Sequence, residues 1–292
     1  MSNIHTLADY RDGYGENLPF NRTPGYYASQ SSFIQRSKPI DVVNLIFPHF
    51  TWKSFVMVIS IIQIIVFIVS LSIKPGEFLT PSGSILVTLG ANVASKIKNG
   101  EIHRLILPIF LHANIFHAFF NVFFQLRMGF TLEKNYGILK VAILYFVTGI
   151  YGNILSSSVT YCTTKVGAST SGMGLLGIVT SELILLWHII RHRERVVFNI
   201  LFFALISILY YFTFNGSNID HVGHLGGLLS GKFRNQKADE NIFPGISIGM
   251  LYNEKMENKP TWYNSARIAS YACLALLAII PTVVLFAVPR VC

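Results

Sequence analysis

Seven apolar runs separated by polar stretches organise the sequence. A helix needs roughly 20 apolar residues to cross the hydrocarbon core of a bilayer, and all runs except the glycine-rich sixth approach that length. The predicted spans cover residues 55–73, 107–130, 137–157, 167–190, 196–214, 222–231 and 266–288. Residues 74–106 are too polar for a span and too apolar for a plain linker, so we expect this stretch to dock against the helices.

Composition agrees with a membrane protein. The chain is 52% hydrophobic and only 13% charged, whereas soluble domains average about 25% charged residues. Lys and Arg concentrate after the second, fourth and sixth spans, which makes those loops cytosolic. The N-terminus is then cytosolic and the C-terminus outside. Loop charge explains the net charge of +9, so we expect the lipid bilayer and no nucleic acid as a partner.

These patterns divide the chain into four parts. We expect a cytosolic N-terminal arm over residues 1–52, a six-helix core over 53–235, a cytosolic linker over 236–263, and a seventh transmembrane helix with a short outer tail over 264–292. The predicted fold class is an all-α polytopic membrane protein.

The three cysteines, Cys162, Cys273 and Cys292, are dispersed and form no metal-type pair. They indicate no disulfide framework, and we expect all three to be bystanders. We expect no metal and no cofactor.

The second predicted span is unusually polar. A polar side chain in hydrocarbon costs free energy unless it has a partner or lines a wet cavity. His117 and Asn121 are four residues apart and share a helix face, and His112 lies nearer the outer end. Interhelical hydrogen bonding, worth about 0.6 kcal/mol on average, is the simpler explanation for this segment alone.

The fourth span opens with small residues and hydroxyls, from Gly167 through Ser169 and Ser171 to Gly174. Small residues let another helix come close. A hydroxyl at a helix N-terminus can cap the backbone, or it can face a cavity and react.

The sixth span carries Gly223, Gly227 and Gly231 at intervals of four residues, which predicts close helix packing. His224 follows the first of these glycines. Taken alone, a histidine here is more often a satisfied polar group than a general base.

The three segments together indicate chemistry. Ser169 and His224 lie at the outer ends of two helices, and His117 and Asn121 lie on a third. These residues supply a nucleophile, a base and oxyanion donors, the parts required for acyl transfer. No acidic third member is evident, so we infer a Ser–His dyad; we expect Asp220 to sit in the loop at the mouth.

These motifs resemble the rhomboid family of intramembrane serine proteases over roughly residues 50–235. The segment His112–Asn121 resembles the family's HxxxxHxxxN helix, and Arg104 matches the arginine before it. Gly167-x-Ser169 is similar to the GxS motif, and His224-x-x-Gly227-x-x-x-Gly231 to the base helix. The Gly-Ala-Ser-Thr-Ser form resembles rhomboids of the apicomplexan-parasite type. The extra C-terminal helix is similar to the eukaryotic secretase-like layout, which has a six-helix rhomboid-like core plus one further transmembrane helix.

The resemblance implies Ser169 as nucleophile and His224 as base. It implies His117, Asn121 and the Ser169 backbone N–H as oxyanion donors, with His112 a nearby structural group. It also implies a multi-pass protein of the secretory pathway or plasma membrane that cleaves transmembrane segments of single-span proteins, such as surface adhesins. The alternative is an inactive relative that binds transmembrane clients, although such proteins typically lack the serine or histidine.

The sequence departs from the family pattern at three positions. Thr170 replaces the usual glycine after the nucleophile, Met173 replaces an aromatic residue, and His103 replaces the tryptophan before the arginine. Two alternatives stay open: Ser171 as nucleophile and His221 as base.

Overall fold

A computed structural model describes residues 42–185, a few helical residues between 194 and 208, and residues 220–230 and 263–290. For residues 42, 45, 181–185, 263–271, 273, 274 and 277 only the backbone is described. All of them belong to one compact unit, residues 41–292. Within these ranges the regular elements are helices, with only isolated β-bridges between extended residues, which confirms the all-α class.

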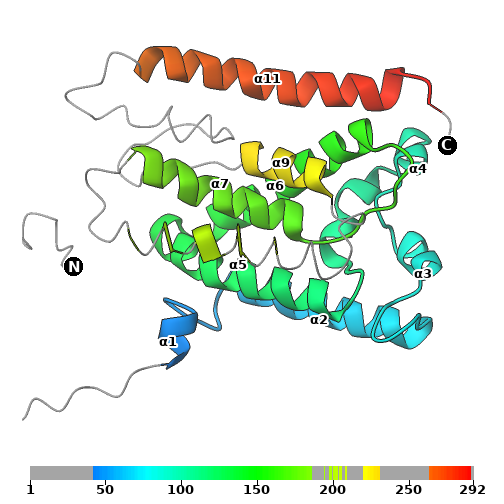
Figure 1. Cartoon of the computed structure of the whole chain (residues 1–292), viewed down its shortest axis with the longest axis horizontal. Helices are drawn as coiled ribbons and strands as arrows, with labels where there is room; N and C mark the ends of the chain where they lie inside the picture. The colour runs from blue at the N-terminus through cyan, green and yellow to red at the C-terminus, as the bar shows by residue number, and fades with distance from the viewer. Residues whose placement is uncertain are drawn as a thin grey trace, which may run out of the picture. The chain divides into compact units, whose positions relative to one another are not determined.

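The helices along the chain are α1 (Val42–Ile46), α2 (Phe55–Ile73), α3 (Gly83–Thr88), α4 (Ala94–Lys98), α5 (Ile115–Tyr136), α6 (Ile138–Val159), α7 (Ser169–Leu185), α9 (His221–Ser230) and α11 (Tyr263–Ala287), with short 3-10 turns η1 (Ile102–Leu105) and η2 (Leu107–Phe110). Helices α6, α7 and α9 pack against one another, α2 packs on α5, and α11 runs beside α6 (Figure 1).

Helix α5 corrects the predicted second span, which was set at 107–130. The helix begins at Ile115, because Asn114 is extended and its side-chain oxygen accepts a hydrogen bond from His117 N at 2.8 Å. Residues 107–110 form η2, with a proline in its first turn. His112 therefore precedes the helix instead of lying on it.

The other predicted spans agree with the helices to different extents. α2 matches its prediction, and α6, α9 and α11 match within a few residues at most ends. α7 starts at Ser169, and its predicted end at 190 lies outside the described residues, as does most of the predicted fifth span, 196–214, and nearly all of the linker. Among described helices, α2 and α6 are long and apolar enough to cross a membrane. Seven spans therefore remain a prediction.

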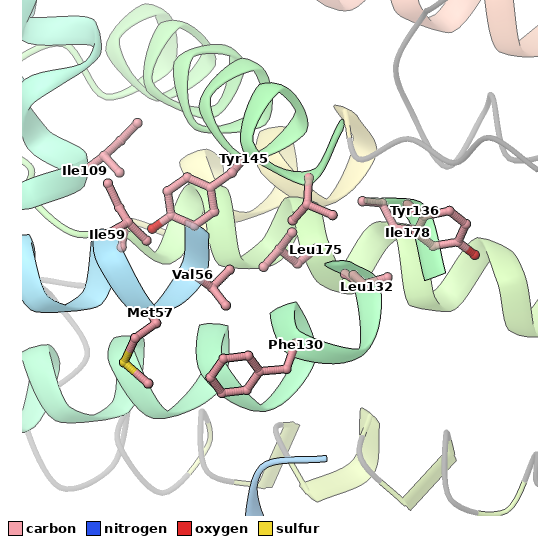
Figure 2. Packing of buried hydrophobic residues seen from close by; sticks show 12 residues of the cluster. Val56, Met57, Ile59, Ile109, Phe130, Leu132, Tyr136, Tyr145, Leu175 and Ile178 are labelled. Carbon is pink, nitrogen blue, oxygen red and sulfur yellow. The ribbon is translucent and has the colours of Figure 1, made fainter. Parts of the chain in front are cut away.

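The core lies between α2, α5, α6 and α7 (Figure 2). Tyr145 and Val141 of α6 are fully buried there, together with Val56 of α2. The inward face of α2 also carries polar side chains, Ser60 and Gln63, while valines and isoleucines cover its outer face. This distribution suits a helix that meets lipid outside and polar partners inside.

Those polar side chains form a closed network. Tyr145 Oη donates to Gln125 Oε1 at 2.6 Å, and Gln63 Nε2 donates to Tyr145 Oη at 2.9 Å. Gln125 Nε2 in turn donates to Gln63 Oε1 at 2.6 Å and to Ser60 Oγ at 2.7 Å. The network joins α2, α5 and α6, and nothing in the sequence pattern predicted it.

The stretch between α2 and α5 is docked on the helices, as expected. Arg104 Nη1 donates to the carbonyls of Val87 and Ala91 at 2.7 and 3.0 Å, and Nε donates to Glu101 at 2.6 Å. Asn92 pairs by backbone hydrogen bonds with Lys165, in the segment before α7. Arg104 is buried and holds this loop, so the loop is ordered with His103 in place of tryptophan.

Cys162 contradicts the expectation that the cysteines are bystanders, because it is disulfide-bonded. The chain offers two partners, Cys273 and Cys292. Described residues just before the C-terminus contact the core nearby: Arg290 donates to the carbonyl of Ser158 at 2.6 Å.

Candidate active site

Ser169 is the first residue of α7 and is half-buried. The chain reaches it through Gly167, whose φ is +131°, a conformation that L side chains rarely adopt. Gly167 N donates to the carbonyl of Pro108 in η2 at 2.8 Å, which anchors this turn. The first N–H groups of a helix lack intrahelical partners and favour negative charge. Ser169 thus combines a hydroxyl with donors suited to an oxyanion.

His117 lies directly against this turn. A β-carbon placed on Gly167 would be 2.7 Å from His117 Cε1, 2.8 Å from its Nε2 and 3.5 Å from Ser169 Oγ. The imidazole of α5 and the hydroxyl of α7 therefore face the same small space beside Gly167. Only a glycine leaves that space open.

Asn121 and His112 flank His117. Asn121 is buried one turn further along α5, and its Nδ2 donates to the carbonyl of His117 at 2.8 Å. His112 is fully buried, and its ring packs edge-on to His117 with centroids 5.4 Å apart. His112 thus supports the ring of His117 from the loop that precedes α5.

Helix α9 meets α7 through glycine, as the spacing predicted. A β-carbon on Gly227 would collide with the carbonyl of Thr170, and one on Gly223 would lie 3.1 Å from Thr170 Cγ2. His224 directly follows Gly223, and Ser169 directly precedes Thr170. The four predicted residues Ser169, His224, His117 and Asn121 thus come from three helices that meet at one end of α7.

Thr170 accounts for one departure from the family pattern. Its side chain is 2% exposed, and its Cβ would be 2.9 Å from a β-carbon placed on Gly152 of α6. The extra volume of threonine is therefore accommodated by a glycine on the facing helix. The larger residue fills the junction of α6, α7 and α9 instead of the catalytic space.

Ser171 and His221, the alternative nucleophile and base, do not face the space beside Gly167. Ser171 is fully buried, and its hydroxyl points at Gly149 of α6, away from Gly167. His221 is the first residue of α9 and is exposed.

Asp220 and Lys165 make hydrogen bonds beside the site that the sequence did not predict. Asp220 caps α9: its Oδ1 accepts hydrogen bonds from Gly223 N at 2.9 Å and from Ser156 Oγ of α6 at 2.5 Å. Lys165 is buried nearby, and its Nζ donates to the carbonyls of Ser156 and Thr160 at 3.1 and 2.7 Å. An acidic residue directly before an apolar, glycine-rich run is a helix-start signal that would have identified the cap.

In the part of the chain that the structure describes, no three His, Cys, Asp or Glu side chains are grouped as metal ligands.

Several known proteins are similar to this chain in sequence. Residues 99–234 match the Rhomboid domain. The chain is 46% identical to rhomboid-like protease 1 of Toxoplasma gondii, over all of this chain and 98% of the relative. It is 35% identical to rhomboid-like protease 2 of the same organism, over 99% of this chain and the whole relative. It is also 34% identical to the mitochondrial RHOMBOID-like protein 6 of Arabidopsis thaliana, over 54% of this chain and 51% of that protein.

The similarity extends over the whole length of the two Toxoplasma proteases, including the regions on either side of the Rhomboid domain. This similarity confirms the apicomplexan type that the motifs indicated. Since rhomboid proteins are integral membrane proteins, it also confirms that class for this chain. The chain belongs to the rhomboid family of intramembrane proteases.

Proposed function

We propose that the protein is an intramembrane serine endopeptidase in which Ser169 and His224 form a catalytic dyad. The single observation that carries this proposal is the shared space beside Gly167. Ser169 Oγ and the imidazole of His117 border it, and α9 brings His224 to the same end of α7. A nucleophile, a base and oxyanion donors at one place are the requirement for acyl transfer.

The chemistry follows from these positions. Ser169 Oγ attacks the scissile carbonyl while His224 takes its proton, and the carbonyl oxygen becomes an oxyanion. The N–H of Ser169 and the side chains of His117 and Asn121 donate to that oxyanion. When the tetrahedral intermediate collapses, the peptide C–N bond breaks and His224 protonates the leaving amine. Water then attacks the acyl-enzyme by the same steps.

Membrane placement limits the substrate. We infer that the site opens near the outer face, since the charge distribution puts the N-terminus in the cytosol and the start of α7 outside. Single-span membrane proteins, such as surface adhesins, would then be cut near the outer ends of their helices. A helical peptide bond must unwind before attack, so helix-breaking residues near the cleavage site would favour a substrate. The resemblance to the apicomplexan proteases favours the secretory pathway or plasma membrane.

The alternative is a catalytically inactive relative that binds transmembrane clients. It is the weaker proposal, because the chain retains a serine in the Gly167-x-Ser169 motif and a histidine in the glycine-rich motif that begins at His224.

The test uses the full-length protein in liposomes with a single-span substrate. We expect cleavage by the native protein, loss of cleavage with Ser169→Ala or His224→Ala, and labelling of Ser169 by a serine-directed phosphonate. Cleavage that survives Ser169→Ala but is lost with Ser171→Ala would overturn the assignment of the nucleophile. Binding of the substrate with neither cleavage nor labelling would favour the inactive relative.

A further inference from the structure

Helix α9 packs on its neighbours mainly through small residues. It is ten residues long, and its buried residues are Gly223, Gly226, Gly227 and Ser230. A β-carbon on Gly226 would be 3.0 Å from the Cα of Gly152 in α6, so backbone meets backbone there. Side chains of Thr170 and Leu155 pack over these glycines from α7 and α6, but the buried face of α9 itself has no large side chain to interdigitate and resist sliding. A polar contact at the start of α9 can therefore set how deep His224 lies.

Asp220 makes that contact. Its Oδ1 accepts from Ser156 Oγ of α6 at 2.5 Å and from Gly223 N, in the first turn of α9, at 2.9 Å. Its backbone carbonyl accepts from His224 N at 2.9 Å. A single residue therefore links the side of α6 to the backbone of the residue that carries the proposed base.

Lys165 joins the same contact from the other direction. Its Nζ donates to the carbonyl of Ser156, and its charge interacts favourably with Asp220. Lys165 is four residues before Ser169, and its backbone pairs with Asn92 in the docked loop. The cluster of Ser156, Asp220 and Lys165 thus connects α6, the start of α9 and the segment that leads into Ser169.

We propose that Asp220 is a positioning residue that, by bridging Ser156 of α6 to the first turn of α9, sets the distance between His224 and Ser169. This inference rests on the proposed dyad. Asp220 acts through hydrogen bonds to Ser156 and to the backbone, and the carboxylate is not a third catalytic member. Substrate binding does not involve the bridge, so its loss changes turnover more than affinity.

The test compares variants of the full-length protein in liposomes with a single-span substrate, measuring kcat and KM separately. Ser156→Ala removes the donor from α6, and Asp220→Ala removes the bridge. Because misplacing reacting groups by about 1 Å costs up to about 100-fold in rate, we expect kcat to fall about 10- to 100-fold in both, with KM nearly unchanged. Asp220→Asn retains an oxygen that accepts both bonds and caps as well as Asp, so it should keep most of the activity.

Ser158→Ala is the matched control. Ser158 is buried like Ser156 and lies on the same helix, but its hydroxyl bonds to Leu155 of its own helix at 2.7 Å. We expect native kcat for this variant. The double variant Ser156→Ala with Asp220→Ala should be no slower than Asp220→Ala alone, since both changes remove one contact.

Several outcomes would overturn the inference: native kcat in Ser156→Ala, equal losses in Ser156→Ala and Ser158→Ala, or an additive double variant. A loss in Asp220→Asn as large as in Asp220→Ala would make the charge itself the active feature, and would overturn positioning. If Asp220→Ala does not fold, the kcat values of Ser156→Ala and Asp220→Asn still decide whether Asp220 positions His224. Failure of the dyad is separate, because Ser169→Ala would then cleave like the native protein.

Discussion

Gly167 and His117 are in direct contact, such that a β-carbon at position 167 would lie 2.7 Å from the imidazole. The contact joins the turn before α7 to the first turn of α5. It also explains why the turn requires glycine twice, once for its φ of +131° and once for the ring beside it.

Gly167→Ala should therefore abolish most activity. The new methyl group must displace the ring of His117 or the turn that carries Ser169, and either change disturbs the proposed oxyanion site. Because small misplacements of reacting groups cost up to about 100-fold, we expect initial cleavage rates in liposomes to fall by about that factor.

Gly100→Ala separates strain from contact. Gly100 also has a positive φ, +100°, but a β-carbon there meets nothing within 4 Å. This variant should lose some thermal stability while its cleavage rate stays near native. Equal loss of activity in both variants would show that backbone strain, and not contact with His117, explains the effect.

The buried polar network predicts an effect on stability. Tyr145→Phe removes the hydroxyl that accepts from Gln63 and donates to Gln125, which leaves two buried amides incompletely paired. Losing a partner of a buried polar group costs about 1–3 kcal/mol of unfolding free energy. Denaturation in mixed detergent micelles measures this. Tyr151→Phe, the same change on a half-buried tyrosine of α6, should cost less; an equal cost would contradict the network's role.

The sequence predicts those features of the fold that depend on a local pattern of residues. The glycines at four-residue intervals predicted the close approach of α9, and Gly223 and Gly227 do meet Thr170 of α7. The apolar run over residues 55–73 predicted both ends of α2 without error. Both predictions depend only on neighbouring residues, either one turn apart on a helix or within one uninterrupted apolar run.

Local pattern failed where structure depends on distant residues. Gln63 and Tyr145 bond across 82 positions, and Ser156 and Asp220 across 64. A polar residue in a span looks the same in sequence whether its partner is water, a neighbouring helix or a substrate. The start of α5 was missed for another reason: the apolar run begins already in η2, whereas the N-cap at Asn114 makes the helix begin at Ile115.

Lys165 gives the protein a stability that depends on pH. Burial lowers the pKa of Lys165 from 10.5 to about 8, although Asp220 acts in the opposite direction. Between these two values the unfolded chain holds a proton that the folded protein has released, so the free energy of unfolding rises with pH. Below pH 8 both states are protonated and the contribution is constant.

The measurement is the difference in unfolding free energy between the native protein and Lys165→Met, followed from pH 7 to 10. We expect the native protein to gain relative to the variant as the pH rises above 8, because the variant has nothing to release. A constant difference over this interval would mean that Lys165 keeps its ordinary pKa in the folded protein.

The disulfide at Cys162 predicts a covalent link to the C-terminal segment. Arg290 contacts Ser158, four residues before Cys162, and two residues of chain reach at most about 7 Å. Cys292 is therefore within reach by chain length, whereas Cys273 precedes the end of α11 by about 21 Å of helix. We expect peptide mapping without reductant to join Cys162 to Cys292, and reduction to lower the unfolding temperature of the native protein but not of Cys162→Ser. Cys273→Ser should behave like the native protein. Stable disulfides form in oxidising compartments, so a disulfide at Cys162 also supports the proposed orientation, which places this loop outside the cytosol. A reduced Cys162 in protein from native membranes would argue against the disulfide and against that orientation.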